Sequence, residues 1–207
     1  MPPTTDMMNS HIHYVKPDQV EAMRDAAYRG SFGDRDDAIV TLLYDTGLRR
    51  NELRQVNRDM VDLDAAELRI PASIQKDYPN ENTPDPVTFA LDPSQDLRTV
   101  RTLRAYLTDR TDSSDALFPS RKSERMTAKG INDVVKRLAD RAGVRPYHEA
   151  GRGGPDDVSA HTLRHSVAWR MLRAAGSDSN TLYDVRNRLR HATILTTERR
   201  YDHFQTV

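Results

Sequence analysis

The chain has 207 residues, of which 37% are hydrophobic and 30% are charged, a balance typical of an ordinary globular domain. This length is enough for one well-packed domain and short for two. No apolar run is long enough to span a membrane, and the N-terminus lacks the apolar stretch of a signal peptide. Because the chain has no cysteine, disulfides and thiolate metal sites are excluded. We therefore expect a cytoplasmic protein.

The formal net charge is zero, with 31 cationic and 31 acidic residues. DNA-binding proteins commonly carry a basic excess, so this total argues against DNA binding. The cations, however, are 26 Arg and only 5 Lys, and the planar guanidinium of Arg suits phosphate. A GC-rich genome is the plainer explanation of the Arg bias, so function must be argued from the positions of particular residues.

Helical periodicity dominates the chain after a non-periodic start, for which we expect a flexible arm over residues 1–16. Apolar residues then recur at three- and four-residue intervals, the period of an amphipathic helix. The predicted helices cover residues 17–29, 36–46, 50–56, 97–107, 131–138, 159–172, 182–189 and 196–204. Gly47 is the expected C-cap of the second helix, and Ser159 is the expected N-cap of the sixth.

Two stretches alternate apolar and polar residues and predict strands, at residues 68–70 and 87–91. A polar turn rich in Pro and Asn joins them, and Lys76 lies near the tip of this predicted hairpin. Residues 151–157 are rich in Gly, Pro and Asp and should form a mobile loop. The predicted fold class is mainly α with a small antiparallel β-sheet (α+β), in one domain over residues 17–207.

His161, Arg164 and His165 have the spacing that places side chains on one helix face. With Ser159 as cap, the first two of them lie in the first two turns, where free N–H groups and the helix dipole favour an anion such as phosphate. Alone, this pattern is more often a solvated Arg beside hydrogen-bonded histidines. Zinc is a further alternative, but no acidic third ligand follows and Arg164 repels a cation. We expect no metal and no cofactor.

Three more residues suit phosphate chemistry. Arg49 lies one helical turn before Glu52, a carboxylate that can orient its guanidinium, although such a pair is more often a surface ion pair. Lys76 can donate a proton to a leaving oxygen, although a hairpin lysine is usually only solvated. Tyr201, near the C-terminus, has a phenol whose ordinary pKa is ~10, so it needs activation to act as a nucleophile. For one of eight tyrosines, a packing role is the plainer interpretation.

Taken together and in order, these segments resemble the catalytic domain of the tyrosine recombinases, the phage integrase family. The resemblance extends from about Pro17 to Phe204. It rests on Thr46-Gly47-Leu48-Arg49 with Glu52-Leu53, on His161-x-x-Arg164-His165, on Leu189-Arg190-His191, and on Thr196-Thr197 before Tyr201.

The resemblance implies a site-specific recombinase that breaks and rejoins DNA without metal or ATP. Arg49 and Arg164 would clamp the scissile phosphate and stabilise the transition state, with Glu52 supporting Arg49. Tyr201 would attack phosphorus to give a 3′-phosphotyrosyl link. The implied partners are double-stranded DNA and further copies of the chain, as a tetramer, in a nucleoid-associated protein.

The remaining roles implied by the resemblance concern proton transfer and positioning. Lys76 would be the general acid that protonates the leaving 5′ oxygen, and His161 would assist proton transfer. His191 would hydrogen-bond the phosphate, and His165 would pack and position its neighbours. The rival interpretations are a DNA-relaxing enzyme with the same chemistry, a non-catalytic DNA-binding regulator that retains the fold, and a metal-dependent nuclease.

The chain departs from the family pattern in three ways. The family usually has Gly immediately before its final histidine, where this chain has Arg190. The interval from His191 to Tyr201 is one residue longer than the commonest family pattern. Family members typically carry an N-terminal helical domain that clamps DNA, and we expect no such core-binding domain in this chain.

Overall fold

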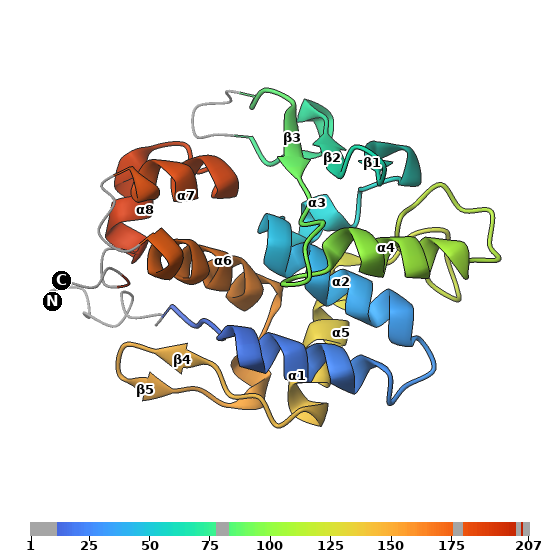
Figure 1. Cartoon of the computed structure of the whole chain (residues 1–207), viewed down its shortest axis with the longest axis horizontal. Helices are drawn as coiled ribbons and strands as arrows, with labels where there is room; N and C mark the ends of the chain where they lie inside the picture. Colours follow the sequence, from blue (N-terminus) through green and yellow to red (C-terminus); the bar gives the residue numbers. More distant parts are fainter. Residues whose placement is uncertain (1–11, 78–82, 176–179, 202–203, 205–207) are drawn as a thin grey trace, which may run out of the picture.

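The structure is a computed structural model and describes residues 12–77, 83–175, 180–201 and 204 (Figure 1). Its α-helices are α1 (Pro17–Ala27), α2 (Gly33–Thr46), α3 (Arg50–Leu53), α4 (Thr99–Thr108), α5 (Ala128–Arg141), α6 (Ala160–Ala175), α7 (Thr181–Leu189) and α8 (Ile194–Tyr201). Its strands are β1 (Val61–Asp62), β2 (Glu67–Ile70), β3 (Val87–Ala90), β4 (Tyr147–His148) and β5 (Gly151–Arg152). The predicted class, mainly α with a small antiparallel sheet, is confirmed. Within these ranges no helix is long and apolar enough to cross a bilayer.

Helix α2 lies at the centre of the fold and packs against α1, α4, α5 and α6 (Figure 1). Every residue from Asp36 to Thr46 is buried. The predicted apolar face is wholly buried and consists of Ala38, Ile39, Leu42 and Leu43. The helix begins at Gly33, three residues before the predicted start, and acidic residues in its first turn favour the positive end of its dipole. Burial on all sides fixes the C-terminal end of α2, where the candidate site begins.

Gly47 ends α2 with a left-handed backbone, φ 68°, and its N–H donates to the Leu43 carbonyl at 3.0 Å. A Cβ at this position would lie 2.5 Å from Leu189 Cδ2 of α7. Glycine is therefore required both by the backbone conformation and by the close approach of α7. The predicted C-cap is confirmed.

The first sheet is antiparallel, in the order β1-β2-β3, with Leu68 of β2 opposite Phe89 of β3. Strands were predicted at residues 68–70 and 87–91, and both are confirmed. β1 was not predicted because a strand of two residues is too short to show alternation. After β2 the chain forms a 3₁₀ turn and then reaches Gln75 and Lys76. The tip of the predicted hairpin, at residues 78–82, lies outside the described residues.

The expectation of a flexible arm is wrong for residues 12–16. The N–H of Tyr14 donates to the Tyr147 carbonyl at 3.0 Å, and the N–H of Tyr147 donates back at 2.8 Å. Val15 is wholly buried. The segment thus adds a backbone bridge to the edge of β4, a contact that leaves no periodic trace in the sequence. Residues 1–11 lie outside the described part of the chain.

Residues 151–157 do not form the expected irregular loop. They contain β5, which pairs antiparallel with β4, and a 3₁₀ turn at Pro155–Asp157. Helix ends also differ from their predicted positions, since α1 ends at Ala27, α3 ends at Leu53 and α8 begins at Ile194. The predicted continuation of the last helix beyond Tyr201 runs through residues 202–203, which lie outside the described residues. Short strands and helix ends depend on tertiary contacts that periodicity does not report.

Gly47→Ala should lower the free energy of unfolding by about 2 kcal/mol or more, because a Cβ in the left-handed region costs about 1 kcal/mol and the contact with Leu189 adds overpacking. Gly143→Ala is the matched control, because Gly143 has φ 65° with open space within 4 Å of an added Cβ. Urea denaturation of both variants measures the difference. Equal losses would show that α7 does not press on this position.

Candidate active site

A cleft of about 630 Å³ lies where α3, the first turns of α5 and α6, and the β2–β3 connection meet. Four of the predicted catalytic residues line this cleft, namely Arg49, Lys76, His161 and Arg164. They come from separate parts of the sequence, so the fold brings them around one space.

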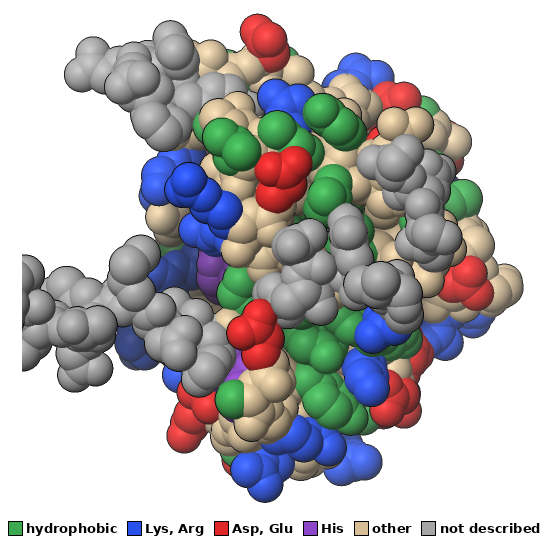
Figure 2. Space-filling model, turned by 90° about the vertical axis from the view of Figure 1, so that its left-hand side faces the viewer, with side chains coloured by type: hydrophobic (Ala, Val, Ile, Leu, Met, Phe, Trp, Pro, Cys, Tyr) green, Lys and Arg blue, Asp and Glu red, His purple; other side chains and the backbone are tan. Residues whose placement is uncertain are grey.

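Among the described residues, cationic side chains outnumber acidic ones around the cleft. These cations are Arg49, Arg50, Lys76 and Arg164, and the carboxylate among the described lining residues is that of Glu52, which is 1% exposed. Figure 2, which views the molecule from the left-hand side of Figure 1, shows Lys and Arg side chains next to a histidine. The net charge of zero for the whole chain therefore does not describe the cleft, where the excess of positive charge attracts anions.

The N-terminal end of α6 faces the cleft, and Ser159 caps it. The Thr162 N–H donates to Ser159 Oγ at 3.2 Å, and the Ser159 N–H donates to Thr162 Oγ1 at 3.1 Å. The predicted cap is confirmed, and His161 and Arg164 lie in the first two turns of the helix. The positive end of the helix dipole thus adds to the charge of the cleft.

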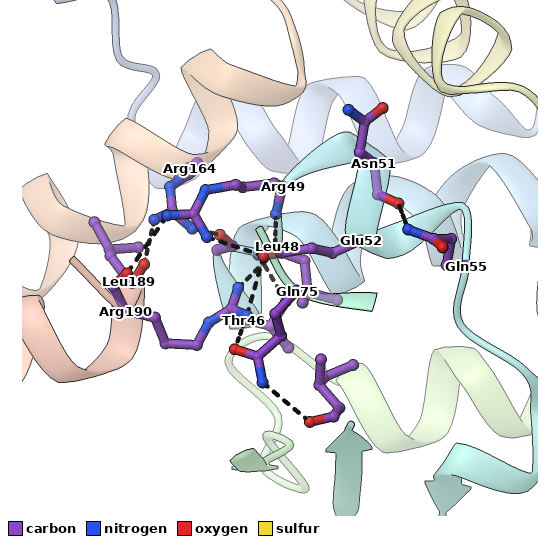
Figure 3. Close-up of polar contacts among 12 residues, drawn as sticks. Thr46, Leu48, Arg49, Asn51, Glu52, Gln55, Gln75, Arg164, Leu189 and Arg190 are labelled. Carbon is purple, nitrogen blue, oxygen red and sulfur yellow. Dashed lines mark hydrogen bonds and ion pairs between the residues drawn. The ribbon is translucent and has the colours of Figure 1, made fainter. Parts of the chain in front are cut away.

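Arg164 is 2% exposed, and its guanidinium donates to the carbonyls of Gly47 and Leu189 (Figure 3). These carbonyls lie at the C-terminal ends of α2 and α7, where the helix dipoles favour a cation. Burial, followed by the charge of Arg49, lowers the pKa of Arg164 to about 9. The side chain therefore stays charged at neutral pH and is fixed in orientation by the backbone.

The carboxylate of Glu52 accepts four hydrogen bonds (Figure 3). Arg49 donates two, from its backbone N–H at 2.8 Å and from Nη1 at 2.9 Å. Arg190 donates the others, from Nη2 at 2.6 Å and from Nη1 at 3.2 Å. Burial alone would raise the pKa of Glu52, but the guanidiniums of Arg190 and Arg49 outweigh it and hold that pKa below its ordinary value. The ionised carboxylate fixes Arg49, which supports its predicted role.

Arg190 was identified from the sequence only as a departure from the family pattern, and its contacts were not predicted. The residue has φ 53° and ψ 53°, the left-handed conformation that usually selects Gly at a helix C-terminus. Its side chain is buried and also donates to Gln75 Oε1 at 3.1 Å. An Arg where the family usually has Gly was the available signal, because a residue that tolerates this backbone strain needs a compensating contact.

Tyr201 is wholly buried and, among the described residues, neither it nor His191 lines the cleft. The Tyr201 hydroxyl lies 2.7 Å from His165 Nδ1, a contact that the sequence did not predict. The Tyr201 ring stacks on His191 with centroids 5.9 Å apart and on Phe204 at 5.6 Å. His191 Nδ1 is in turn 2.9 Å from Thr197 Oγ1. The predicted nucleophile is therefore docked within its own chain.

The buried phenol is protonated at neutral pH. Burial raises the pKa of Tyr201 to about 12, although the charges of Arg164 and Arg200 oppose the shift. A protonated phenol can donate its O–H to Nδ1 of a neutral His165. This hydrogen bond ties the hydroxyl to α6, and Tyr201 is not among the described residues that line the cleft.

The histidines of the site are neutral at neutral pH. Desolvation lowers the pKa of His161 to about 4 and that of His191 to about 3, and the positive charge of Arg164 acts in the same direction. Desolvation likewise holds the pKa of His165 well below its ordinary value. His161 is exposed at the cleft, whereas His191 is 7% exposed. A neutral imidazole at the cleft can accept a proton.

Metal ligands do not gather in the described part of the chain: no group of three or more His, Asp or Glu side chains there could hold an ion. His161 and His165 stack edge to face with centroids 4.3 Å apart. The Nδ1 atom of His165 is engaged by the Tyr201 phenol.

The neutral histidines should make stability depend on pH. An unfolded histidine binds a proton near pH 6.5, whereas His191 in the folded chain binds one only near pH 3, so the free energy of unfolding falls as pH drops below 6.5. Each such histidine contributes up to about 1.4 kcal/mol per pH unit. His191→Asn should give a shallower fall between about pH 6.5 and pH 4.5 by urea denaturation. Identical slopes would refute the lowered pKa.

The sequence model of the Phage integrase family matches residues 13–206. The chain is 32% identical over 171 residues to tyrosine recombinase XerC of Herpetosiphon aurantiacus, an alignment that covers 82% of this chain and 48% of that protein. This chain spans about half the length of the curated relatives it matches.

Two solved structures are similar to this fold. The crystal structure of XerA recombinase matches with a TM-score of 0.70 at 22% identity, covering 100% of this chain and 62% of that one. The Tn1549 transposon integrase in complex with transposon right end DNA matches with a TM-score of 0.71 at 15% identity, covering 99% of this chain and 64% of that one. At these identities the likeness concerns the fold alone.

Proposed function

The chain belongs to the phage integrase family, and we propose that it is the catalytic domain of a site-specific DNA recombinase. Such an enzyme cleaves and rejoins DNA strands through a 3′-phosphotyrosyl intermediate and needs neither metal nor ATP. The strongest support is the positively charged cleft in which Arg49, Lys76, His161 and Arg164 surround one space. Its proposed ligand is the scissile phosphodiester.

In this proposal the two arginines clamp the non-bridging oxygens of the phosphate. Arg49 is held by Glu52, and Arg164 is held by the carbonyls at two helix ends. Both guanidiniums are thus oriented before DNA binds, which lowers the reorganisation needed when negative charge develops in the transition state. Loss of one such donor commonly slows a reaction by about 100- to 1,000-fold.

The cleavage step forms one bond and breaks one. The Tyr201 oxygen attacks phosphorus as the bond from phosphorus to the 5′ oxygen breaks. The phenolic proton passes to neutral His161, and Lys76 donates a proton to the 5′ oxygen. Because the phosphotyrosine retains the energy of the broken bond, the reverse attack by a 5′-hydroxyl rejoins a strand.

The docked phenol supports a resting state in which the nucleophile is withheld. To reach a phosphate in the cleft, Tyr201 must leave its hydrogen bond with His165. His191 engages Thr197 through Nδ1, which leaves Nε2 as the proposed donor to the phosphate. Movement of α8 would therefore precede cleavage.

The proposed partner is double-stranded DNA, and strand exchange requires self-association, for which we propose a tetramer on two duplexes. The cation excess of the cleft supports DNA binding despite the zero net charge. The Tn1549 transposon integrase, whose fold is similar, forms a complex with transposon right end DNA. The proposed location is the cytoplasm, at the nucleoid.

Covalent trapping tests the proposal. Wild-type protein incubated in chelator with nicked duplexes of the DNA flanking its gene, then quenched with detergent, should yield protein-linked DNA. Tyr201→Phe should yield none, because a phenyl ring has no oxygen with which to attack. Tyr183→Phe is the matched control, since Tyr183 is 55% exposed on α7 and should leave the yield unchanged.

Two results would overturn the assignment. An adduct that persists in Tyr201→Phe would identify another nucleophile. DNA binding by the wild type without any adduct would favour a non-catalytic regulator that retains the recombinase fold.

A further inference from the structure

Arg190 occupies a backbone conformation that opposes its presence. Its φ of 53° and ψ of 53° lie in the left-handed region, which strains a residue with a Cβ but not Gly. The Arg190 N–H donates to the Asn187 carbonyl at 3.1 Å, and the His191 N–H donates to the Arg186 carbonyl at 3.1 Å, so the turn that ends α7 is formed by the backbone alone. Glycine would form the same turn without strain. The presence of Arg at this position must therefore be explained by the contacts of its side chain.

The Arg190 side chain joins three segments beneath the cleft (Figure 3). It binds both oxygens of Glu52 on α3, and Nη1 donates to Gln75 Oε1 on the β2–β3 connection. Its own carbonyl accepts from Arg49 Nη2 at 3.4 Å. Arg190, at the α7–α8 junction, thus contacts Arg49, Glu52, which orients Arg49, and Gln75, which precedes Lys76.

Gln75 passes this restraint to the β2–β3 connection. Its Nε2 donates to the Asp85 carbonyl at 2.7 Å and to the Ile70 carbonyl at 3.3 Å, so it ties the two ends of the connection together. Its backbone N–H donates to the Ala72 carbonyl at 3.0 Å. Lys76 follows directly in the chain and lines the cleft. The contacts of Gln75 therefore restrain the backbone next to Lys76.

We infer that Arg190 is a positioning residue, which couples the phosphate clamp at Arg49 to the general acid at Lys76 through Glu52 and Gln75. The inference rests on the proposed function for its catalytic meaning. The structural part of the inference, that Arg190 restrains the segment that carries Lys76, follows from the hydrogen bonds alone. Arg190→Gly removes the side chain and relieves the backbone strain, so this variant should remain folded.

The leaving atom of the substrate distinguishes a positioning role from a structural one. A 5′ oxygen needs a proton as it leaves, whereas a sulfur in its place leaves as a thiolate, because thiols ionise near pH ~8.5, far below alcohols. A loss of cleavage rate that arises only from the general acid should therefore disappear on a duplex with sulfur at the 5′-bridging position. A loss that arises from the phosphate clamp should persist on the sulfur duplex.

Single-turnover cleavage of oxygen and sulfur duplexes is the test. Gln75→Met should slow cleavage of the oxygen substrate by about 10- to 100-fold, within the range of general-acid effects, and should cleave the sulfur substrate at close to the wild-type rate. Arg190→Gly should slow cleavage of the oxygen substrate at least as much, and the sulfur substrate should recover the general-acid part of that loss, leaving only the part that acts through Arg49. Lys76→Ala should show the pattern of Gln75→Met more strongly. Arg49→Lys should remain slow on both substrates.

Arg188→Gln is the matched control. Arg188 lies on α7, two residues before Arg190, and pairs at 2.7 Å with the buried carboxylate of Asp45 on α2, a helix that does not line the cleft. Its loss should leave the ratio of oxygen to sulfur rates unchanged. The inference is overturned if Arg190→Gly cleaves the oxygen substrate at the wild-type rate, or if sulfur fails to rescue it while rescuing Lys76→Ala.

Hydrogen exchange tests whether Arg190 restrains the segment before Lys76, and it needs no cleavage activity. The amides of Ile74 and Gln75, which donate to carbonyls within the 3₁₀ turn, should exchange at least about tenfold faster in Arg190→Gly than in Arg188→Gln. Equal exchange in the two variants overturns the inference. Failure of the wild type to cleave either substrate would instead refute the proposed function, and the exchange result would still decide the role of Arg190.

Discussion

Four donors converge on the carboxylate of Glu52, and the arrangement of the cleft depends on them. A carboxylate that is 1% exposed is stable only when its charge is compensated, and Arg49 and Arg190 supply two positive charges to one negative. The group therefore carries a surplus of one positive charge. Because Arg190 shares the carboxylate, Arg49 is oriented by Glu52 without being fully neutralised, and it keeps attraction for an anion in the cleft.

The C-terminal end of α2 is the second fixed point. Three arginines donate to its last carbonyls, and they are Arg164, Arg170 and Arg188. Cations at a helix C-terminus are stabilised by its dipole, and a guanidinium can reach several carbonyls at once. The Arg-rich composition thus has a structural use in this fold besides the proposed phosphate contact. Gly47 permits this crowding, because any larger residue would press against α7.

Much of this arrangement follows from short-range features of the sequence. The helices follow from apolar periodicity, and Gly47 and Ser159 act as the caps that their residue types favour. The cleft contains Arg49 and Arg164, which short ordered motifs identify. These features depend on neighbours within one or two helical turns, and the local sequence therefore contains them.

The features that were not predicted depend on distant partners. Arg190 and Glu52 lie 138 positions apart in the sequence, so the residues next to either one do not predict their ion pair. The docking of Tyr201 depends on His165, 36 positions earlier, and on how α8 packs. The bridge between Tyr14 and Tyr147 joins the start of the described chain to a two-residue strand. In each case the contact is set by the tertiary fold.

Nitrogen-15 NMR of the arginine side chains in the protein alone measures whether Glu52 fixes the guanidinium of Arg49 before any ligand binds. We expect slow rotation of the Arg49 guanidinium in the wild type and fast rotation in Glu52→Gln. Arg69, whose side chain is 65% exposed and pairs with Glu67 at 3.6 Å, gives the reference for a surface guanidinium. Rotation of Arg49 in the wild type as fast as that of Arg69 would show that Glu52 does not hold it.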